Sequence, residues 1–417
     1  MKSTLELRDY QEEISNNAVV LLKKYKIAYL AMQVRTGKTL TAMATAYKFG
    51  AKSVLFVTKK KAISDIVNQF SASKFELGIY VINFEQLGNV KESFDLIIID
   101  EAHSLSAFPV PSGRAKELKR ICFGKPIIYL SGTPNPESFS QLYHQFWVSS
   151  YSPFDYHKTF YKWANDFVYV KKMMINGQSF NDYKKADEKK VMECCKHLFI
   201  TYTQEQAGFE SFVQETVHHV EMQESTYKFA ERLRIDKIMT NKDGEVVLAD
   251  TAVKLMQKLH QLWSGTVKFE NGNSMTIDTT KAEFIKSQFA TSKIGVFYKF
   301  KEELSALKDV FGKDLTEKLE DFDTGQYKVI ALQIVSGREG ISLKNADYVV
   351  FYNIDFSATS YWQARDRMTT MERKFNKVYW IFSAGGIEDK IYKAVKSKKS
   401  YTLNIFKKDY EQTREDK

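Results

Sequence analysis

Residues 27 to 39 read Ile27-Ala28-Tyr29-Leu30-Ala31-Met32-Gln33-Val34-Arg35-Thr36-Gly37-Lys38-Thr39. The first five are apolar and indicate a buried strand, and a helical pattern follows as far as Gly50. A strand that leads into a helix through Gly-Lys-Thr is typical of a phosphate-binding loop, in which backbone N–H groups and a helix N-terminus hold phosphate oxygens. This stretch therefore predicts an α/β fold built on a parallel sheet.

Short apolar runs recur on both sides of the chain's midpoint, separated by helical patterns. They cover residues 53–57, 96–99 and 127–130 in the first half, and 295–298, 329–333 and 348–352 in the second. Continuous Val/Ile/Leu/Phe runs between helices predict parallel sheets that are covered on both faces. We expect two α/β lobes, residues 1–211 and 212–417, with a mostly helical insertion at about 146–205 in the first lobe.

Composition limits the class of protein. The chain has 61 Lys and Arg against 51 Asp and Glu, a net charge of +10, which favours a polyanionic partner. Its three cysteines, Cys122, Cys194 and Cys195, do not have the spacing of a zinc site or of a disulfide framework. The N-terminal residues lack the apolar run of a signal peptide, and no apolar run is long enough for a membrane span. We therefore expect a cytoplasmic protein that does not bind membranes.

In the loop, Lys38 is expected to neutralise the β- and γ-phosphates, and the Thr39 hydroxyl to ligate Mg²⁺. The usual first glycine of such a loop falls at Met32, so the full pattern is not met. An ordinary strand-to-helix turn with a surface lysine is the alternative reading of these residues.

Residues 96 to 103 read Leu96-Ile97-Ile98-Ile99-Asp100-Glu101-Ala102-His103. Four apolar residues deliver two carboxylates to the carboxyl end of a strand, the edge where α/β sheets bind ligands. We expect Asp100 to hold Mg²⁺ through water, and Glu101 to orient and deprotonate an attacking water molecule.

The sequence Asp100-Glu101-Ala102-His103 resembles the DEAH signature of superfamily-two helicases. Four further stretches are similar to motifs of that superfamily and occur in the same order. Leu7-Arg8-Asp9-Tyr10-Gln11 resembles the adenine-reading Gln motif, and Leu130-Ser131-Gly132-Thr133-Pro134 the coupling motif. The stretch from Ser336 to Leu343 and the stretch from Gln363 to Arg367 are similar to the AGGEGLNL and QAxDR motifs of Swi/Snf-type translocases.

This resemblance implies two RecA-like lobes in tandem and assigns roles to individual residues. It implies that Gln363 and Arg367 are catalytic, with Arg367 as the arginine finger, and that ATP is hydrolysed when the lobes close. The family's second arginine falls at Thr370, so Arg365 or Arg373 remains a candidate replacement. The implied nucleotide-binding residues are Arg8, Gln11, Arg35, Thr36, Gly37, Lys38, Thr39 and Gly340. The implied coupling residues are His103, Ser131 and Thr133.

Nucleic acid is expected to contact residues that follow strands in both lobes. A hydroxyl, lysines and a helix N-terminus after the strand at 53–57 suit phosphate contacts, and none of these groups reads bases. The expected contact residues are Thr58, Lys59, Lys60, Asn83, Phe84, Lys299, Ser336 and Gly337.

We therefore expect an ATP- and Mg²⁺-dependent DNA translocase, similar to compact phage-type helicases, that favours duplex or branched DNA with little sequence preference. Replication or recombination proteins are its candidate partners. Two alternatives stay open: a strand-separating helicase acting on RNA or single-stranded DNA, and a nucleotide-gated DNA-binding scaffold with little turnover. Direction of movement and oligomeric state do not follow from the sequence.

Overall fold

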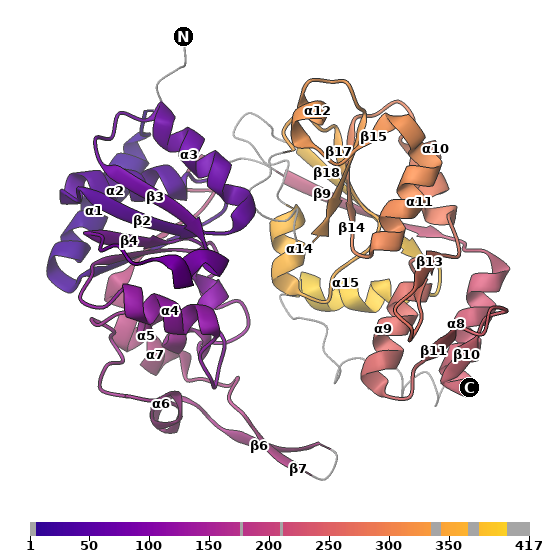
Figure 1. The fold of residues 1–417 in the computed structure, drawn as a ribbon, viewed down its shortest axis with the longest axis horizontal. Coiled ribbons are helices and arrows are strands. Elements are labelled where there is room, and N and C mark those ends of the chain that lie inside the picture. Colours follow the sequence, from indigo (N-terminus) through magenta and orange to yellow (C-terminus); the bar gives the residue numbers. More distant parts are fainter. Residues whose placement is uncertain (1–5, 176–177, 209–211, 335–342, 366–374, 398–417) are drawn as a thin grey trace. The chain divides into compact units, whose positions relative to one another are not determined.

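The computed structural model describes residues 6–175, 178–208, 212–334, 343–365 and 375–397. The chain divides into two compact units, Met1–Phe209 and Glu210–Lys417, which we call lobe 1 and lobe 2 (Figure 1). This division lies two residues before the boundary expected from the sequence. Each lobe contains its own six-stranded sheet, which is the fold class that the apolar runs predict.

The sheet of lobe 1 is parallel throughout, with the order β3-β2-β4-β5-β1-β8. Its strands begin and end as follows: β1 (Ile27–Met32), β2 (Ser53–Thr58), β3 (Gly78–Asn83), β4 (Leu96–Ile99), β5 (Ile127–Leu130) and β8 (Phe199–Tyr202). Four of them are the apolar runs identified in the sequence. Because all six strands run in one direction, the residues that follow β1, β2, β4 and β5 gather at one edge of the sheet.

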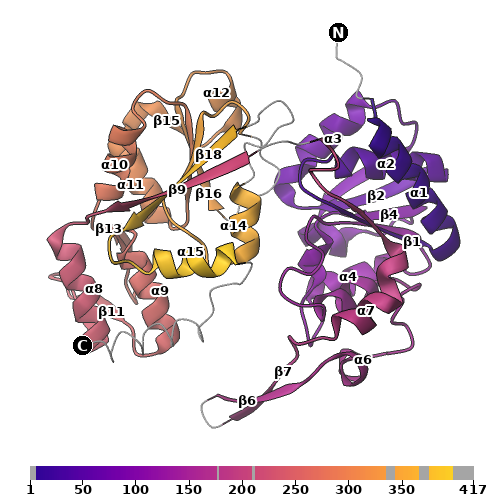
Figure 2. The ribbon, with the colours of Figure 1, turned by 180° about the vertical axis from the view of Figure 1, so that it is seen from behind.

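Alternate strand residues of lobe 1 face two separate helical layers. Ala28 and Leu30 of β1 pack in one cluster with α1 (Asp9–Tyr25), α2 (Lys38–Phe49) and α3 (Ile63–Ala72). Ile27 and Tyr29 pack in the opposite cluster with α4 (Gly113–Ile121), α5 (Gln141–Trp147), α6 (Phe160–Phe167) and α7 (Glu188–Cys195). Helices therefore cover both faces of this sheet (Figures 1 and 2).

The predicted insertion at 146–205 is not mostly helical, which corrects the expectation. It contains α6 and α7, but also an antiparallel hairpin, β6 (Lys171–Ile175) and β7 (Gln178–Asp182), and it ends in β8, which pairs with β1. The sequence Asn176-Gly177 between the hairpin strands is a strong hairpin signal, which the helical expectation does not take into account. The role of β8 depends on pairing with a strand about 170 residues away in sequence.

Lobe 2 repeats the architecture with the parallel order β15-β16-β14-β17-β18-β9. The strands are β9 (Phe212–Val220), β14 (Ile294–Tyr298), β15 (Leu315–Thr316), β16 (Val329–Gln333), β17 (Tyr348–Phe351) and β18 (Phe375–Ser383). Helices α10 (Thr280–Gln288) and α11 (Lys301–Phe311) cover one face. The other face packs against α8 (Glu224–Asp236), α9 (Ala252–Leu262), α14 (Ala358–Arg365) and α15 (Glu388–Lys396), and α12 (Leu319–Asp323) adds Phe322 to that cluster.

Two short hairpins lie among the helices α8 to α10 of lobe 2: β10 (Ile238–Thr240) with β11 (Val246–Leu248), and β12 (Thr266–Lys268) with β13 (Ser274–Thr276). They contribute Met239, Val247 and Val267 to the core of the lobe. Among the described residues, no helix has the length and apolar character needed to cross a membrane.

Candidate active site

The loop between β1 and α2 has the backbone of an anion-binding turn. Arg35 and Gly37 both have left-handed φ angles, 64° and 80°, and such residues turn successive N–H groups toward one side of a loop. The carbonyl oxygen of Gln33 accepts hydrogen bonds from the Thr36 hydroxyl at 2.8 Å and from the Lys38 ammonium at 3.3 Å. Met32, where the usual glycine is missing, is a buried residue of β1 that pairs with Tyr202, so no glycine conformation is required there.

Gln11 of α1 braces this loop. Its amide nitrogen lies 3.4 Å from the carbonyl oxygens of Thr36 and Gly37, and its amide oxygen accepts from the Arg8 N–H at 2.9 Å. The side chain leaves no room for a Cβ at Gly37, because that atom would lie 1.9 Å from Gln11 Nε2. The structure thus brings Gln11, Arg8 and residues 36–37 together, as the sequence predicts for one nucleotide-binding unit, while base reading by Gln11 stays a prediction.

The two carboxylates lie just beyond β4. The Thr58 hydroxyl donates to Asp100 Oδ2 at 2.7 Å, because β2 and β4 are neighbours in the sheet. Burial and then the charge of Glu101 raise the pKa of Asp100 to about 7, against the Thr58 hydrogen bond and the Lys38 ammonium, which lower it. Because β1 and β4 both pair in parallel with β5, the phosphate loop and the acidic pair lie at the same edge of the sheet.

Glu101, His103 and Ser131 form a connected group behind this pair. His103 Nδ1 lies 3.2 Å from Glu101 Oε2 and 3.0 Å from Ser131 Oγ. Ser131 is fully buried, and its hydroxyl oxygen also accepts from the Thr133 N–H at 3.2 Å. His103 thus lies within ion-pair distance of the acidic pair and within hydrogen-bonding distance of the segment after β5. This is the juxtaposition expected of the coupling residues.

Gln145 of α5 extends this network, although no sequence motif marks it. The side chain is fully buried, accepts from the Tyr29 hydroxyl at 2.6 Å, and donates to the carbonyl of Pro134 at 2.7 Å and to the Ser106 hydroxyl at 2.8 Å. It thereby fixes the segments that follow both β4 and β5. Gln145 lies in a short helix that also contains Gln141 and His144, so its residue type does not single it out.

The segment that leads out of β8 also holds the phosphate loop. The Gln204 side chain donates to the carbonyl of Val34 at 2.9 Å, and its backbone N–H donates to Gln33 Oε1 at 2.8 Å. Tyr202 stacks on Tyr10 at 4.7 Å between ring centroids. These contacts join residues about 170 to 190 positions apart, so local sequence patterns do not reveal them.

Three predicted nucleic-acid contacts of lobe 1 are buried instead. The structure uses the fully buried Thr58 hydroxyl for Asp100. Asn83 caps the short helix η2 (Phe84–Asn89), because its side-chain oxygen accepts from the N–H groups of Glu85 and Gln86 at 3.0 Å. Phe84 is only 3% exposed and belongs to the core. Lys59 is half-buried and Lys60 is exposed at the start of η1 (Lys60–Ala62), so these two remain candidates.

Lys299 in lobe 2 is also committed elsewhere. Its ammonium lies 2.5 Å from Asp355 Oδ1, with both side chains largely buried. Burial raises the pKa of Asp355, but Lys299 outweighs burial and holds that pKa below its ordinary value. A lysine neutralised in this way is not available to a nucleic-acid phosphate, and the pairing partner, which lies 56 residues away, was not evident from the sequence.

Several predicted lobe 2 residues lie outside the described residues. These are Ser336, Gly337, Gly340, Arg367, Thr370 and Arg373. Gln363 lies on α14. Arg365, a candidate replacement finger, lies at the end of the same helix with its Nε 3.5 Å from Glu215 Oε1 and its guanidinium over the Trp362 ring. Glu215 also accepts from Tyr361, Trp380 and Tyr392, so Arg365 belongs to a cluster that fixes α14 within lobe 2.

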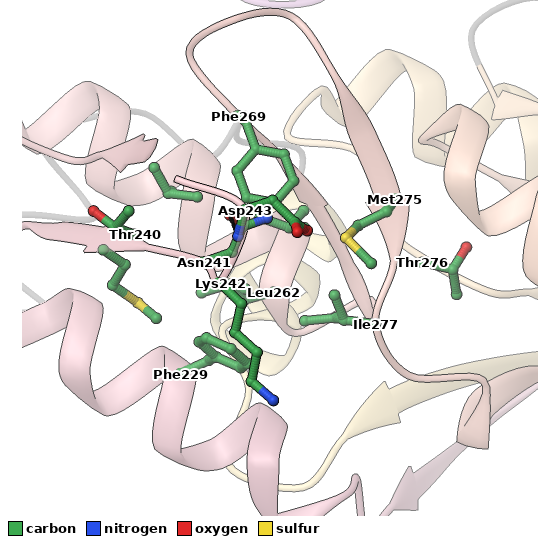
Figure 3. A pocket seen from close by; sticks show the side chains of 13 residues that line it. Phe229, Thr240, Asn241, Lys242, Asp243, Leu262, Phe269, Met275, Thr276 and Ile277 are labelled. Carbon is green, nitrogen blue, oxygen red and sulfur yellow. Dashed lines mark hydrogen bonds between the residues drawn. The ribbon is translucent and has the colours of Figure 1, made fainter. Parts of the chain in front are cut away.

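A pocket of about 400 Å³ lies between the two short hairpins of lobe 2 (Figure 3). Its lining includes Phe229 of α8, Leu262 of α9, Phe269 and Met275, and its polar edge is the turn from Asn241 to Asp243. None of the residues predicted for nucleotide or nucleic-acid binding lines it. It is therefore separate from the candidate active site.

Two protein-family models match the chain, one in each lobe. Residues 4–77 match the type III restriction enzyme res subunit, and residues 274–370 match the helicase conserved C-terminal domain. The first match contains the phosphate loop, and the second contains the stretches at 336–343 and 363–367. The chain is a helicase-type enzyme. It is accordingly an ATP-hydrolysing enzyme of a class that couples hydrolysis to nucleic acid.

Solved structures with similarity to this helicase include two from Sulfolobus solfataricus. One is the SWI2/SNF2 ATPase core in complex with dsDNA, at 14% identity and a TM-score of 0.42, covering 98% of this chain and 93% of that chain. The other is the SWI2/SNF2 ATPase core domain, at 16% identity and a TM-score of 0.43, covering 97% and 91%. A search of curated protein sequences gave no match.

Proposed function

We propose that this helicase is a Swi/Snf-like DNA translocase, which hydrolyses MgATP and uses the energy to move along duplex or branched DNA. The observation that carries the proposal is the arrangement at the edge of the lobe 1 sheet. There the loop that carries Lys38 and the pair Asp100 and Glu101 follow β1 and β4 of one parallel sheet, and His103 lies 3.2 Å from Glu101 and 3.0 Å from Ser131. A motor requires that the residues that hydrolyse the nucleotide contact a second segment, so that hydrolysis can change the position of that segment.

In the proposed reaction, the loop N–H groups and Lys38 bind the β- and γ-phosphates. Glu101, whose backbone is left-handed with a φ of 50°, accepts a proton from the attacking water. His103 then transmits the change in charge at Glu101 to Ser131 and Thr133. Arg367 is the proposed group that stabilises the transferring phosphoryl from the second lobe.

The residues present fit a magnesium ion. Thr39 follows Lys38 in the first turn of α2, and Asp100 offers a carboxylate held by Thr58. Mg²⁺ prefers oxygen ligands and usually keeps several waters, which suits one hydroxyl and one carboxylate. When bound, the ion neutralises charge on the β- and γ-phosphates.

The choice of DNA is supported by the two second-lobe stretches that are similar to Swi/Snf-type motifs, at 336–343 and 363–367. The net charge of +10 agrees with a polyanionic track. Because the candidate contacts Lys59 and Lys60 offer no group for reading bases, we expect little sequence preference.

The decisive experiment measures ATP turnover while duplex DNA, single-stranded DNA or RNA is titrated. Stimulation that is strongest with duplex DNA supports the proposal, and Lys38→Ala should abolish it while leaving the circular dichroism spectrum unchanged. Stimulation by RNA or single strands alone would transfer the assignment to a strand-separating helicase. Turnover that no nucleic acid raises would refute the motor.

A further inference from the structure

The hairpin β6–β7 of lobe 1 has no role in the site described above. It extends away from the body of the lobe (Figures 1 and 2), and its strands pair only with each other. Isolated two-stranded hairpins are marginally stable in water. An exposed hairpin that serves no core must therefore be held at its base, and it offers its free surface to a partner.

The hairpin and its flanks carry a surplus of positive charge. Residues 169–190 contain six lysines and three acids. Two of the acids are used locally, since Asp182 accepts from the Lys184 N–H at 3.0 Å and Asp187 caps α7 and accepts from the Tyr169 hydroxyl at 3.1 Å. The exposed lysines Lys171 and Lys172 form no ion pair with any described residue, in contrast to the nearby Lys158, which pairs with Asp155 at 3.2 Å.

The same hairpin exposes an aromatic ring beside this charge. Met173 lies directly opposite Phe180 and Lys171 directly opposite Asp182, so strand alternation places these four residues on one face. Lys172, opposite Asn181, lies on the other face. Phe180 is 46% exposed. Lysines that meet phosphates, together with a ring on which a base can stack, are the elements with which proteins bind nucleic-acid strands without reading sequence.

The base of the β6–β7 hairpin is hydrogen-bonded to the residues between Ser131 and α5, which we call the coupling segment. The hydroxyls of Ser138 and Ser140 donate to the carbonyls of Lys184 and Tyr183, each at 2.5 Å. Both serines are buried and lie in the segment that runs from Ser131 to α5. That segment is also held at Pro134 by Gln145. The segment between β5 and α5 is therefore joined by two direct hydrogen bonds to the residues that follow β7.

We propose that the β6–β7 hairpin is a second DNA-binding element, which grips the phosphate backbone through Lys171 and Lys172 and stacks Phe180 on an unpaired base. Its position is set by the coupling segment. The proposal deepens the proposed function and rests on it, because it names a further surface by which the same motor holds its track.

The test measures the affinity of the full chain for a fluorescent forked DNA as a function of salt concentration. We compare Lys171→Glu/Lys172→Glu with Lys23→Glu/Lys24→Glu, which changes the same number of exposed charges at the end of α1. Losing two phosphate contacts should raise Kd about tenfold or more and reduce the slope of log K against log salt by about 2. The control should keep the wild-type slope.

Phe180→Ala supplies an independent readout, because it removes no charge. It should weaken binding to forked DNA several-fold and leave the affinity for blunt duplex and the salt slope unchanged. Equal Kd values for the hairpin and control double variants, with Phe180→Ala at wild-type affinity, would overturn the proposal and favour a protein partner for this surface. If wild-type turnover ignored DNA altogether, the proposed function itself would fail, and the two failures are thereby distinguished.

Discussion

Glu101 has a strained backbone at a position where a carboxylate is needed. A left-handed φ costs a non-glycine residue roughly 1–2 kcal/mol, and such strain persists only where the surroundings enforce it. Here the contact with His103 and the connection to Ser131 hold the residue in place. The strain is therefore part of how the acidic pair is oriented.

Glu101→Gln keeps the shape of this side chain and removes its basicity. We expect the variant to bind ATP and to hydrolyse it about 10²–10⁴-fold more slowly, the usual contribution of a general base. Single-turnover hydrolysis and nucleotide binding, measured on the same preparation, check this. Wild-type turnover in the variant would remove Glu101 from the role of base.

Gly37 and Gly50 provide a matched pair at the two ends of α2. Both have a left-handed φ, 80° and 87°, but a Cβ at Gly37 meets Gln11 Nε2 at 1.9 Å, whereas nothing lies within 4 Å of one at Gly50. Gly50→Ala should cost about 1 kcal/mol of stability and keep ATP turnover. Gly37→Ala should in addition displace Gln11 and raise the KM for ATP at least tenfold; thermal melts and steady-state kinetics separate the two effects.

At the residue level, the sequence motifs predict which side chains follow the strands of the sheet. Lys38, Asp100, His103 and Ser131 all lie where their motifs place them. The errors have one physical cause. Thr58 and Lys299 each follow a strand, but their polar atoms are bound by Asp100 and Asp355, which arrive from neighbouring strands. The hydrogen-bond or ion-pair partner of a polar side chain depends on the tertiary structure, so the local sequence does not reveal it.

Among the elements, the segment after β8 acts as a clamp on the phosphate loop. Gln204 holds Gln33 and Val34, whereas the nearby Gln206 bonds only within its own turn, where its amide oxygen accepts from the Thr203 N–H at 2.9 Å. Gln204→Ala should raise the KM for ATP about 5–10-fold, the effect of losing one net hydrogen bond of about 1 kcal/mol. Gln206→Ala should match wild type in the same assay. An unchanged KM in both variants would show that the clamp does not support nucleotide binding.

Some helices and strands are determined by their own local sequence, whereas others depend on pairing with distant segments. Buried strands such as β2, β4 and β16 are apolar runs, and their identity follows from the sequence alone. The hairpin β6–β7 and the strand β8 do not, because lysines occupy the first and β8 is defined by its pairing with β1. Burial patterns thus predict the sheet centre better than its margins.

The whole molecule consists of two lobes with separate cores, so each should respond to its own mutations. Lobe 2 contains an ion pair of Lys281 and Glu388 at 2.7 Å, with both side chains fully buried. Lys281→Met leaves Glu388 uncompensated and should destabilise lobe 2 by about 3–5 kcal/mol. Calorimetry should show a lower melting temperature for lobe 2 and an unchanged melting temperature for lobe 1, which is recognised because ATP raises it. The double variant Lys281→Met/Glu388→Leu should recover part of the lost stability. If the melting temperatures of both lobes fell by the same amount, the lobes would not unfold independently.

Turnover by the complete enzyme should depend on one arginine of lobe 2. Arg365 is held by Glu215 and Trp362, so Arg365→Ala should act mainly by lowering the melting temperature of lobe 2. Arg367→Ala should instead slow DNA-stimulated hydrolysis by about 10³–10⁵, the value of an arginine finger, with ATP affinity nearly unchanged. Nucleotide binding, melting and turnover, measured on both variants and on Arg373→Ala, assign the role. If Arg373→Ala were the slow variant and Arg367→Ala hydrolysed ATP normally, Arg373 would be the arginine finger. Removing the arginine that stabilises the transferring phosphoryl group must slow turnover, whereas removing another arginine need not.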